Sequence, residues 1–232
     1  MKNVLKNKLI TIAKENIMND ISHNFSHAYR VLQLVEKIGK AENADLDILI
    51  PAALFHDVKV YKGTSKHEFE HEESSSFAEK ILKSIKEYPK EKIPDVAYAI
   101  SVCSFSKNIN PKTLEAKILQ DADLLEATGA VAIMRTFGSA GSMHLKDFYN
   151  MKDTFCRKRK PDEKVYALDH FFARLLIVQQ RMHTKTAINM SKRRRQFLKE
   201  FLEELNLELR NLSIIPQTFT IRCCYPKQIQ AK

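Results

Sequence analysis

Histidine and aspartate side chains occur in this sequence at positions where several of them could meet. The adjacent residues His56 and Asp57 close the apolar run AALFHD. His27 lies at the start of an earlier apolar stretch, and Asp121 and Asp123 interrupt a later one, LQDADLLEATGA. Imidazole nitrogens and carboxylate oxygens together suit divalent ions such as Mn, Mg, Fe, Co, Ni or Zn. The leading hypothesis is therefore a site for such an ion.

Each of these residues, taken singly, has a simpler explanation. A histidine at a helix start is more often a cap or a surface group, and a helical aspartate is more often solvated or ion-paired. A carboxylate in an apolar helix nevertheless needs a partner, because an unpaired buried charge is expensive. Asp121 and Asp123 are two positions apart and face different sides of a helix, so one ligand is expected from this pair.

Helices must position these groups, because the composition disfavours a strand-rich fold. The 232 residues include only 5 Gly and 7 Pro, too few for the many turns of a β fold. The spacing of apolar residues predicts helices at 3–18, 27–41, 46–57, 68–87, 95–103, 112–136, 163–183 and 186–209. A loop is expected at 58–67, a turn at Gly138–Gly141, and a polar, basic excursion over 142–162.

These elements predict an all-α chain with the site in its first part. We expect an N-terminal helix in 1–20, a helical bundle in 21–140, additional helices packed on it in 141–210, and an irregular tail in 211–232. No apolar stretch is long enough for a membrane span, and the N-terminus does not resemble a signal peptide. The four cysteines show no CxxC spacing, which favours a reduced, cytoplasmic chain.

The positive charge is concentrated in the last third of the chain. Residues 1–150 hold 20 Lys/Arg and 20 Asp/Glu, whereas residues 151–232 hold 18 and 8. Two clusters, RKRK at 157–160 and KRRR at 192–195, carry much of the excess. Such clusters can bind nucleic acid or nucleotides, although a solvated helix face is the more common explanation.

The order His27, His56-Asp57, Asp123 resembles that of the HD superfamily of metal-dependent phosphohydrolases. HNFSHAYRV resembles the family's H-D-x-x-H-x-x-R-V, and AALFHDV resembles its A-A-L-L-H-D-I. LEAKILQDADLLEATGAVAIMRTF resembles L-E-A-K-I-L-Q-D-A-D-x-L-D-A-x-G-A-x-G-I-A-R-x-F, found in small stand-alone bacterial and archaeal members that include a nucleotide pyrophosphohydrolase. The resemblance covers about residues 20–210 and implies a single-domain HD-type bundle with additional C-terminal helices.

The resemblance implies that His27, His56, Asp57 and Asp123 bind one divalent ion. The family's last aspartate lies in an A-D-x-L context, which selects Asp123 and leaves Asp121 to support the site or to bond a neighbouring helix.

Two positions depart from the family pattern. Asn24 replaces an aspartate that would support His27, and Cys103 stands where a histidine is usual. His71 does lie where an additional histidine is expected, as a phosphate ligand or general acid. Because Cys103 cannot replace an imidazole as a proton donor near neutral pH, we expect one ion rather than two.

The implied reaction is hydrolysis of a phosphoester or phosphoanhydride of a small nucleotide by a metal-activated water, with Asp57 as base or orienting group. Candidate phosphate-binding residues are Arg30, Lys59, Lys62 and Arg135. One alternative is a phosphodiesterase acting on cyclic nucleotides or oligonucleotides. Another is a non-catalytic HD module that binds nucleic acid or a protein through its basic last third.

Overall fold

The structure of the protein is a computed structural model that describes residues 1–18, 21–59, 69–103 and 109–210. Its α-helices are α1 (Asn3–Asn16), α2 (Phe25–Ala41), α3 (Leu46–Phe55), α4 (Glu70–Ser84), α5 (Ile93–Ser101), α6 (Leu114–Glu126), α7 (Gly129–Ser142) and α8 (Lys185–Arg210). Within these ranges β structure is limited to one isolated bridge between Asp147 and Tyr166, so the predicted all-α class is confirmed.

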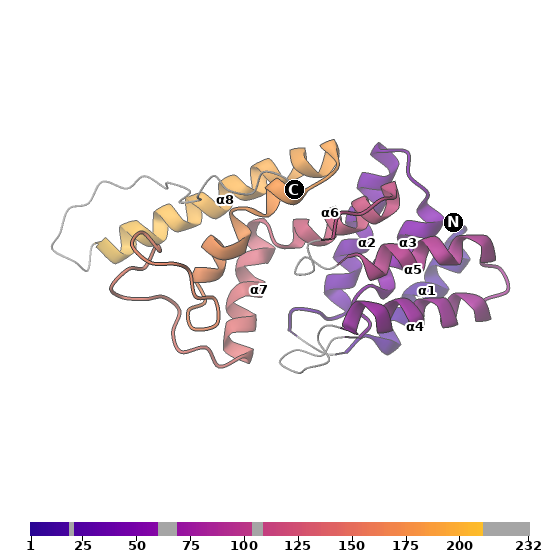
Figure 1. The fold of residues 1–232 in the computed structure, drawn as a ribbon, viewed down its shortest axis with the longest axis horizontal. Helices are drawn as coiled ribbons and strands as arrows, with labels where there is room; N and C mark the ends of the chain where they lie inside the picture. The colour runs from indigo at the N-terminus through magenta and orange to yellow at the C-terminus, as the bar shows by residue number, and fades with distance from the viewer. Residues whose placement is uncertain (19–20, 60–68, 104–108, 211–232) are drawn as a thin grey trace.

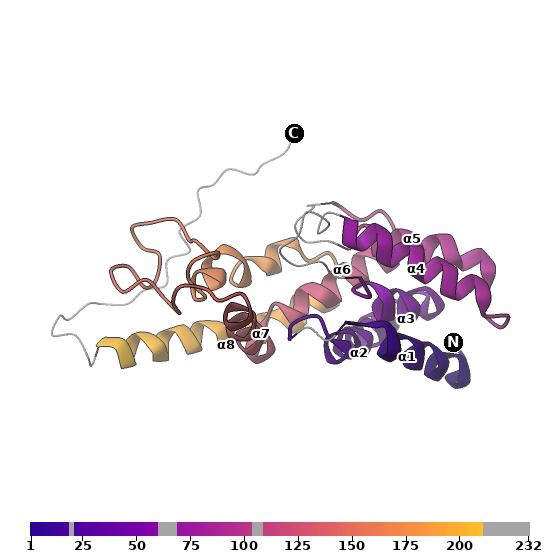
Figure 2. The ribbon, with the colours of Figure 1, turned by 90° about the horizontal axis from the view of Figure 1, so that it is seen from below.

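The helices form two groups, seen side by side in Figure 1. Helices α1 to α6 bury one hydrophobic cluster, which includes Leu32, Leu49 and Phe55. A second cluster lies between α7, α8 and the segment that connects them, and includes Phe171 and Leu198. Viewed at right angles in Figure 2, α6 leads from the first group toward α7. The first group contains all the helices that carry predicted metal ligands.

Helix α3 is the centre of the first group, because all its residues from Ile48 to Phe55 are buried. Pro51 lies inside this helix, where its missing N–H leaves the carbonyl oxygen of Asp47 without its helical donor. The hydroxyl of Tyr88, which is also buried, donates a hydrogen bond to that oxygen at 2.8 Å. A side chain from outside the helix thus replaces the lost backbone bond, which is why the proline is tolerated.

The predicted helix 112–136 is wrong, because α6 ends at Glu126 and α7 begins at Gly129. Gly129 has φ 72°, a left-handed conformation that glycine adopts without strain. A Cβ at this position would also lie 3.2 Å from the Cβ and Cγ atoms of Arg194 in α8. The chain therefore turns sharply at the end of α6, close to the predicted ligand Asp123.

The turn predicted at Gly138–Gly141 is also wrong, since α7 continues to Ser142. Gly138 lies against Ile21 instead, because a Cβ there would approach the Cδ1 atom of Ile21 to 3.4 Å. The hydroxyls of Ser22 and Ser139 share a hydrogen bond beside it. These small residues allow α7 to pack closely against the segment before α2.

The helix predicted at 163–183 does not form. A short π-helical turn (Phe171–Leu175) and a 3₁₀ turn (Val178–Arg181) occupy its second half. In the first half, the N–H groups of Ala167 and Leu168 donate to the carbonyl oxygens of Asp147 and Phe148. The excursion over 142–162 competes for these donors and prevents a regular helix.

Two buried or half-buried carboxylates fix the start of α8. Asp121 of α6 accepts hydrogen bonds from the N–H of His183 and from both the N–H and the hydroxyl of Thr184. Glu42, which follows α2, accepts from the N–H and hydroxyl of Thr186. Both carboxylates satisfy free N–H groups at a helix N-terminus, where negative charge is favourable.

Across the described ranges, we find no helix both long and apolar enough to cross a membrane. The predicted tail 211–232 lies outside those ranges, as does most of the loop predicted at 58–67.

The bond to the Pro51 helix is testable by mutation. Tyr88→Phe should lower the free energy of unfolding by about 1 to 3 kcal/mol, because it leaves the part-buried Asp47 carbonyl without a donor. Urea denaturation measures this change. Tyr29→Phe is the matched control, since Tyr29 is 41% exposed, and it should change stability by less than about 0.5 kcal/mol. Equal unfolding midpoints for the two variants would contradict the assignment.

Candidate metal centre

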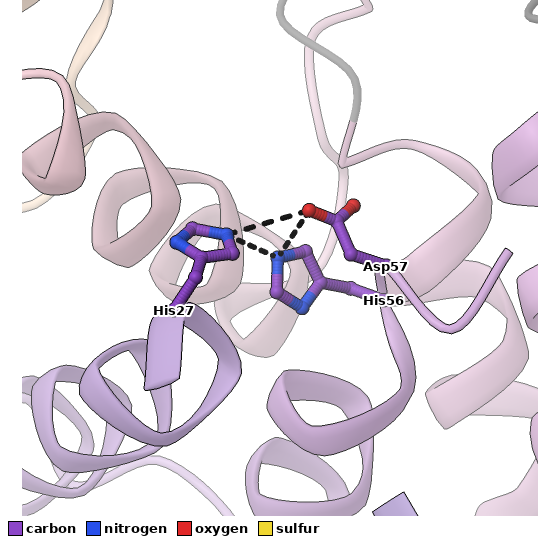
Figure 3. Close-up of side chains that lie close together, drawn as sticks. All are labelled: His27, His56 and Asp57. Carbon is purple, nitrogen blue, oxygen red and sulfur yellow. Dashed lines mark hydrogen bonds and ion pairs between the residues drawn. The ribbon is translucent and has the colours of Figure 1, made fainter. Parts of the chain in front are cut away.

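Three ligand atoms converge between α2 and the end of α3, as Figure 3 shows. The Nε2 atoms of His27 and His56 are 3.3 Å apart. The Oδ2 atom of Asp57 lies 3.4 Å from the first and 3.5 Å from the second. Within the described residues these three form the group whose ligand atoms lie within 4.8 Å of one another.

Asp123 approaches the same place from α6. Its Oδ1 atom is 3.4 Å from Nε2 of His27 and 3.9 Å from Nε2 of His56. Its partner in the predicted pair, Asp121, faces α8 and has its oxygens engaged there. The structure thus brings His27, His56 and Asp57 together, places Asp123 beside both rings, and turns Asp121 away from them.

The distances from Nε2 of His27 to the other three ligand atoms fit one ion. Ligand atoms about 2.0–2.2 Å from a common ion lie roughly 3.0–3.6 Å apart when adjacent in octahedral or tetrahedral coordination. The separations between His27 and His56, Asp57 or Asp123 fall within that range. A shift of a few tenths of an ångström would place Asp123 equally close to His56. The arrangement is therefore a candidate divalent metal site.

Burial differs between the two kinds of ligand. The side chains of His27 and His56 are 0% and 1% exposed, whereas those of Asp57 and Asp123 are 14% and 28% exposed. The two imidazoles therefore lie on the buried side of the site, and the two carboxylates lie on its solvent-exposed side. Water or a substrate therefore has access from the side of the carboxylates.

Local backbone bonds position both histidines. Asn24 is the N-cap of α2, and its Oδ1 atom accepts a hydrogen bond from the N–H of His27 at 3.1 Å. Its role is thus exerted on the backbone of His27 and not on the ring. His56 follows the last residue of α3, and its Nδ1 atom is 2.8 Å from the carbonyl oxygen of Ala53.

The sequence interpretation missed one buried carboxylate, Glu126. It is 2% exposed, and its Oε2 atom lies 3.3 Å from Nδ1 of His27 and accepts a hydrogen bond from Nε of Arg30 at 2.7 Å. The family stretch quoted above has the sequence L-D-A where this chain has LEA at residues 125–127, so the family has aspartate at the position of Glu126. An acidic residue at that position was the available signal.

The surrounding carboxylates raise the pKa of His27 to about 10. Burial acts in the opposite direction and is the largest single effect, but Asp123, Asp57 and Glu126 together outweigh it. Burial also disfavours the charged form of Asp123, yet His27 and His56 lower its pKa to about 2. Three carboxylates thus surround a single buried imidazole, an arrangement that favours a cation.

Comparisons with known proteins identify the family. Residues 24–128 match the HD domain family. The chain is 30% identical over 215 residues to the uncharacterised protein YpgQ of Bacillus subtilis, covering 90% of this chain and 96% of YpgQ. The chain belongs to the HD superfamily. The crystal structure of YpgQ in complex with ADP superposes with a TM-score of 0.66 and 28% identity over 88% of this chain and 94% of that one.

A second solved structure bears the name of an HD-superfamily hydrolase. An HD-superfamily hydrolase from Bacillus thuringiensis superposes with a TM-score of 0.67 and 26% identity, covering 90% of this chain and 99% of the other. Because the match covers 90% of this chain, it includes most of the second group of helices, which therefore belongs to the shared architecture.

Cys103, where this HD protein departs from the usual histidine, lies close to the metal site. Its thiol is 1% exposed, and burial together with the charges of Asp123 and Asp57 holds its pKa well above the ordinary value. The thiol is therefore protonated near neutral pH and is a poor ligand. His71 lies half-buried in the first turn of α4. Within the described residues, neither Cys103 nor His71 belongs to the group of converging ligand atoms.

The predicted phosphate-binding residues differ in their surroundings. The Nζ atom of Lys59 lies over the ring of Phe77, 5.7 Å from its centroid. Lys62 lies outside the described residues. The charge of Arg135 acts on His27, and its buried Nε atom has no hydrogen-bond partner in the described part of the chain. Arg135 is thus a cation near the metal site with donor capacity to spare.

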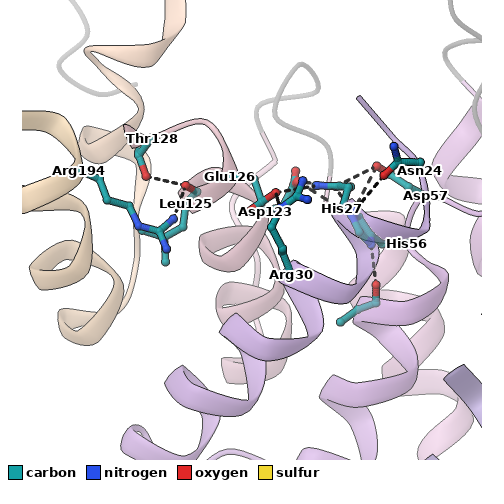
Figure 4. Close-up of polar contacts among 11 residues, drawn as sticks. Asn24, His27, Arg30, His56, Asp57, Asp123, Leu125, Glu126, Thr128 and Arg194 are labelled. Carbon is teal, nitrogen blue, oxygen red and sulfur yellow. Dashed lines mark hydrogen bonds and ion pairs between the residues drawn. The ribbon is translucent and has the colours of Figure 1, made fainter. Parts of the chain in front are cut away.

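The end of α6 is held from α8, as Figure 4 shows. Nη1 of Arg194 donates to the carbonyl oxygen of Leu125 at 2.8 Å, and the hydroxyl of Thr128 donates to the same oxygen. Leu125 lies between Asp123 and Glu126 in the last turn of the helix. A residue of the basic cluster 192–195 therefore fixes the backbone that carries two carboxylates of the site.

Binding of an ion should release a proton from His27. At pH 8 the metal-free ring is protonated because its pKa is about 10, and a ligand nitrogen must be deprotonated. Below pH 10 the apparent affinity for Mn²⁺ should therefore rise by about tenfold per pH unit. Calorimetry in buffers of different ionisation enthalpy measures the released proton between pH 7 and 8.5.

Two variants distinguish proton release by His27 from proton release by other histidines. His27→Gln should abolish the proton release together with most of the binding. His144→Gln, at an exposed histidine, should leave both unchanged. Mn²⁺ binding that is tight and independent of pH would contradict the assignment.

Proposed function

We propose that this HD protein is a metal-dependent phosphohydrolase that acts on a phosphoester or phosphoanhydride of a small nucleotide. The observation that carries the proposal is the convergence of His27, His56 and Asp57, with Asp123 reaching the same two rings from α6 and both aspartates partly exposed to solvent. Membership of the HD superfamily and the likeness to an HD-superfamily hydrolase support hydrolysis as the reaction class.

The likeness to YpgQ favours a nucleotide as substrate. That protein crystallised in complex with ADP, and its chain matches this one over nearly its whole length. A nucleotide presents a phosphate to the ion and a base and sugar to the surrounding surface. We therefore extend nucleotide binding to the present chain as part of the proposal.

In this proposal the four ligands hold one divalent ion, of the kind named above. When bound, such an ion lowers the pKa of a water molecule and polarises a phosphoryl oxygen. Asp57 has one oxygen, Oδ2, directed at the two rings, while its other oxygen points away from them (Figure 3). That second oxygen is placed to accept a hydrogen bond and so to orient the attacking water.

Cationic side chains near the site would bind the phosphate. Arg135 is the strongest candidate, because its charge reaches His27 and its Nε atom lacks a protein partner among described residues. Arg30 donates its Nε to Glu126, which leaves its terminal nitrogens for a substrate oxygen. Lys62 remains a sequence prediction, as does His71 as a phosphate ligand or general acid.

The basic clusters give less support to nucleic-acid binding than their sequence suggests. Arg194 and Arg195 donate to the carbonyl oxygens of Leu125 and Leu176. In the other cluster, Arg159 forms a two-pronged ion pair with the buried Asp169. Several of these charges therefore stabilise the second group of helices.

A nucleotide panel tests the function. Purified protein with added Mn²⁺ should release phosphate or pyrophosphate from at least one nucleoside mono-, di- or triphosphate. Asp57→Ala should reduce the rate by about a thousandfold or more, because it removes both a ligand and the orienting oxygen. Asp95→Ala, at an exposed position in α5, is the matched control and should retain full activity.

The same panel distinguishes the rivals. Turnover of cyclic nucleotides or oligonucleotides, but of no phosphomonoester or anhydride, would favour the phosphodiesterase. Absence of turnover with every compound, together with salt-dependent binding of nucleic acid, would replace the proposal with the non-catalytic module.

A further inference from the structure

Glu126 is a buried acid that the proposed reaction does not itself require. It lies in the last turn of α6, three residues after Asp123, and its side chain is 2% exposed. Residues three apart lie on the same side of a helix, so both carboxylates face α2. Asp123 extends toward Nε2 of His27, whereas Glu126 reaches the opposite nitrogen of the same ring, Nδ1.

A single oxygen of Glu126 serves two donors from α2. Oε2 accepts from Nε of Arg30 at 2.7 Å and lies 3.3 Å from Nδ1 of His27 (Figure 4). His27 and Arg30 are also three residues apart, so α2 presents both toward α6. The charge of Arg30 compensates the buried carboxylate and fixes its position beside the ring.

The position of this oxygen decides which nitrogen of His27 can bind an ion. Nε2 is the atom that faces His56 and Asp57, so its lone pair must be free. A neutral imidazole carries one proton, and a carboxylate beside Nδ1 favours the proton there. His56 is oriented in the same sense by the carbonyl oxygen of Ala53, 2.8 Å from its Nδ1. His27 differs from His56 because the group beside its Nδ1 atom is a charged carboxylate and not a carbonyl oxygen.

We propose that Glu126 is a positioning residue of the metal centre, which holds His27 in the ligand-competent tautomer and orientation, and that Arg30 acts through Glu126. A carboxylate behind a ligating imidazole also makes the ring a stronger donor to the ion. The inference rests on the metal site of the proposed function but not on the identity of the substrate.

A purely structural role for Glu126 makes different predictions. A buried ion pair with Arg30 would join α2 to α6, and its loss would lower stability without selectively altering the metal site. Metal affinity in the folded protein and the state of the His27 ring therefore distinguish the two roles.

Glu126→Gln tests the inference directly. The variant retains the size of the side chain but loses its charge, so Zn²⁺ affinity measured by calorimetry on folded protein should fall 10- to 100-fold. The Nδ1–H proton of His27 in the zinc-loaded protein should move upfield in imidazole ¹H–¹⁵N spectra. Glu203→Gln, at an exposed position in α8, is the matched control and should change neither value. An unchanged Zn²⁺ affinity with an unchanged His27 signal would overturn the proposal.

A double-mutant cycle tests the part assigned to Arg30. If Arg30 acts through Glu126, Arg30→Met alone should weaken Zn²⁺ binding, and the double variant with Glu126→Gln should bind no more weakly than Glu126→Gln alone. If the two losses instead multiply, Arg30 does not act through Glu126. Should Glu126→Gln fail to fold, Glu126→Asp keeps the charge and should bind Zn²⁺ more tightly than Glu126→Ala, and equal affinities for those two would count against the inference.

These measurements are independent of catalysis. Wild-type protein that binds Zn²⁺ but hydrolyses no nucleotide would remove the proposed function and leave this inference standing. An active enzyme whose Zn²⁺ affinity is unaffected by Glu126→Gln would support the proposed function and remove this inference.

Discussion

Asp57, Asp123 and Glu126 all approach the ring of His27, which is itself fully buried. Negative charges brought this close repel one another, and the repulsion is tolerated only when positive charge lies between them. A proton on His27 and the guanidinium of Arg30 supply part of that charge, and a divalent ion would supply more. The rest of the first group of helices has to resist this repulsion by packing.

The packing is strongest where the ligands are attached. Helix α3 is buried from Ile48 to Phe55 and carries His56 and Asp57 at its end, so the core fixes the helix that positions them. The hydrogen bond from Tyr88 restores the one contact that Pro51 removes from this helix. Helix α2 begins at the Asn24 cap, three residues before its ligand. Rigid attachment of this kind lets a protein hold several charges in a geometry that suits an ion.

Much of this arrangement could be predicted from the sequence, because apolar spacing locates the helices that carry the ligands. The order of His27, His56-Asp57 and Asp123 indicated the family, and the match to the HD domain confirmed it. Glu126 was missed because a glutamate at a helix end is normally solvated, and only the fold shows that Arg30 and His27 face it.

Other predictions failed because local patterns do not reveal competing long-range bonds. The sequence around Thr128 and Gly129 continues an apolar helical pattern, yet the break there depends on Arg194 approaching from α8. Residues 163–168 also have helical spacing, but the N–H groups of Ala167 and Leu168 donate to the carbonyl oxygens of Asp147 and Phe148. Neither partner is close in sequence.

The long helix α8 is attached to α6 at two separate points. Near its start, Asp121 accepts bonds from Thr184, and farther along the helix Arg194 donates to Leu125. These attachments are ten residues apart, which corresponds to about 15 Å along a helix. A helix attached at one point can change its direction, whereas a helix attached at two separate points keeps it. The two attachments therefore fix the direction of α8 relative to α6, and α7, which packs on α8 and carries Arg135, is held in place relative to the helix that carries Asp123.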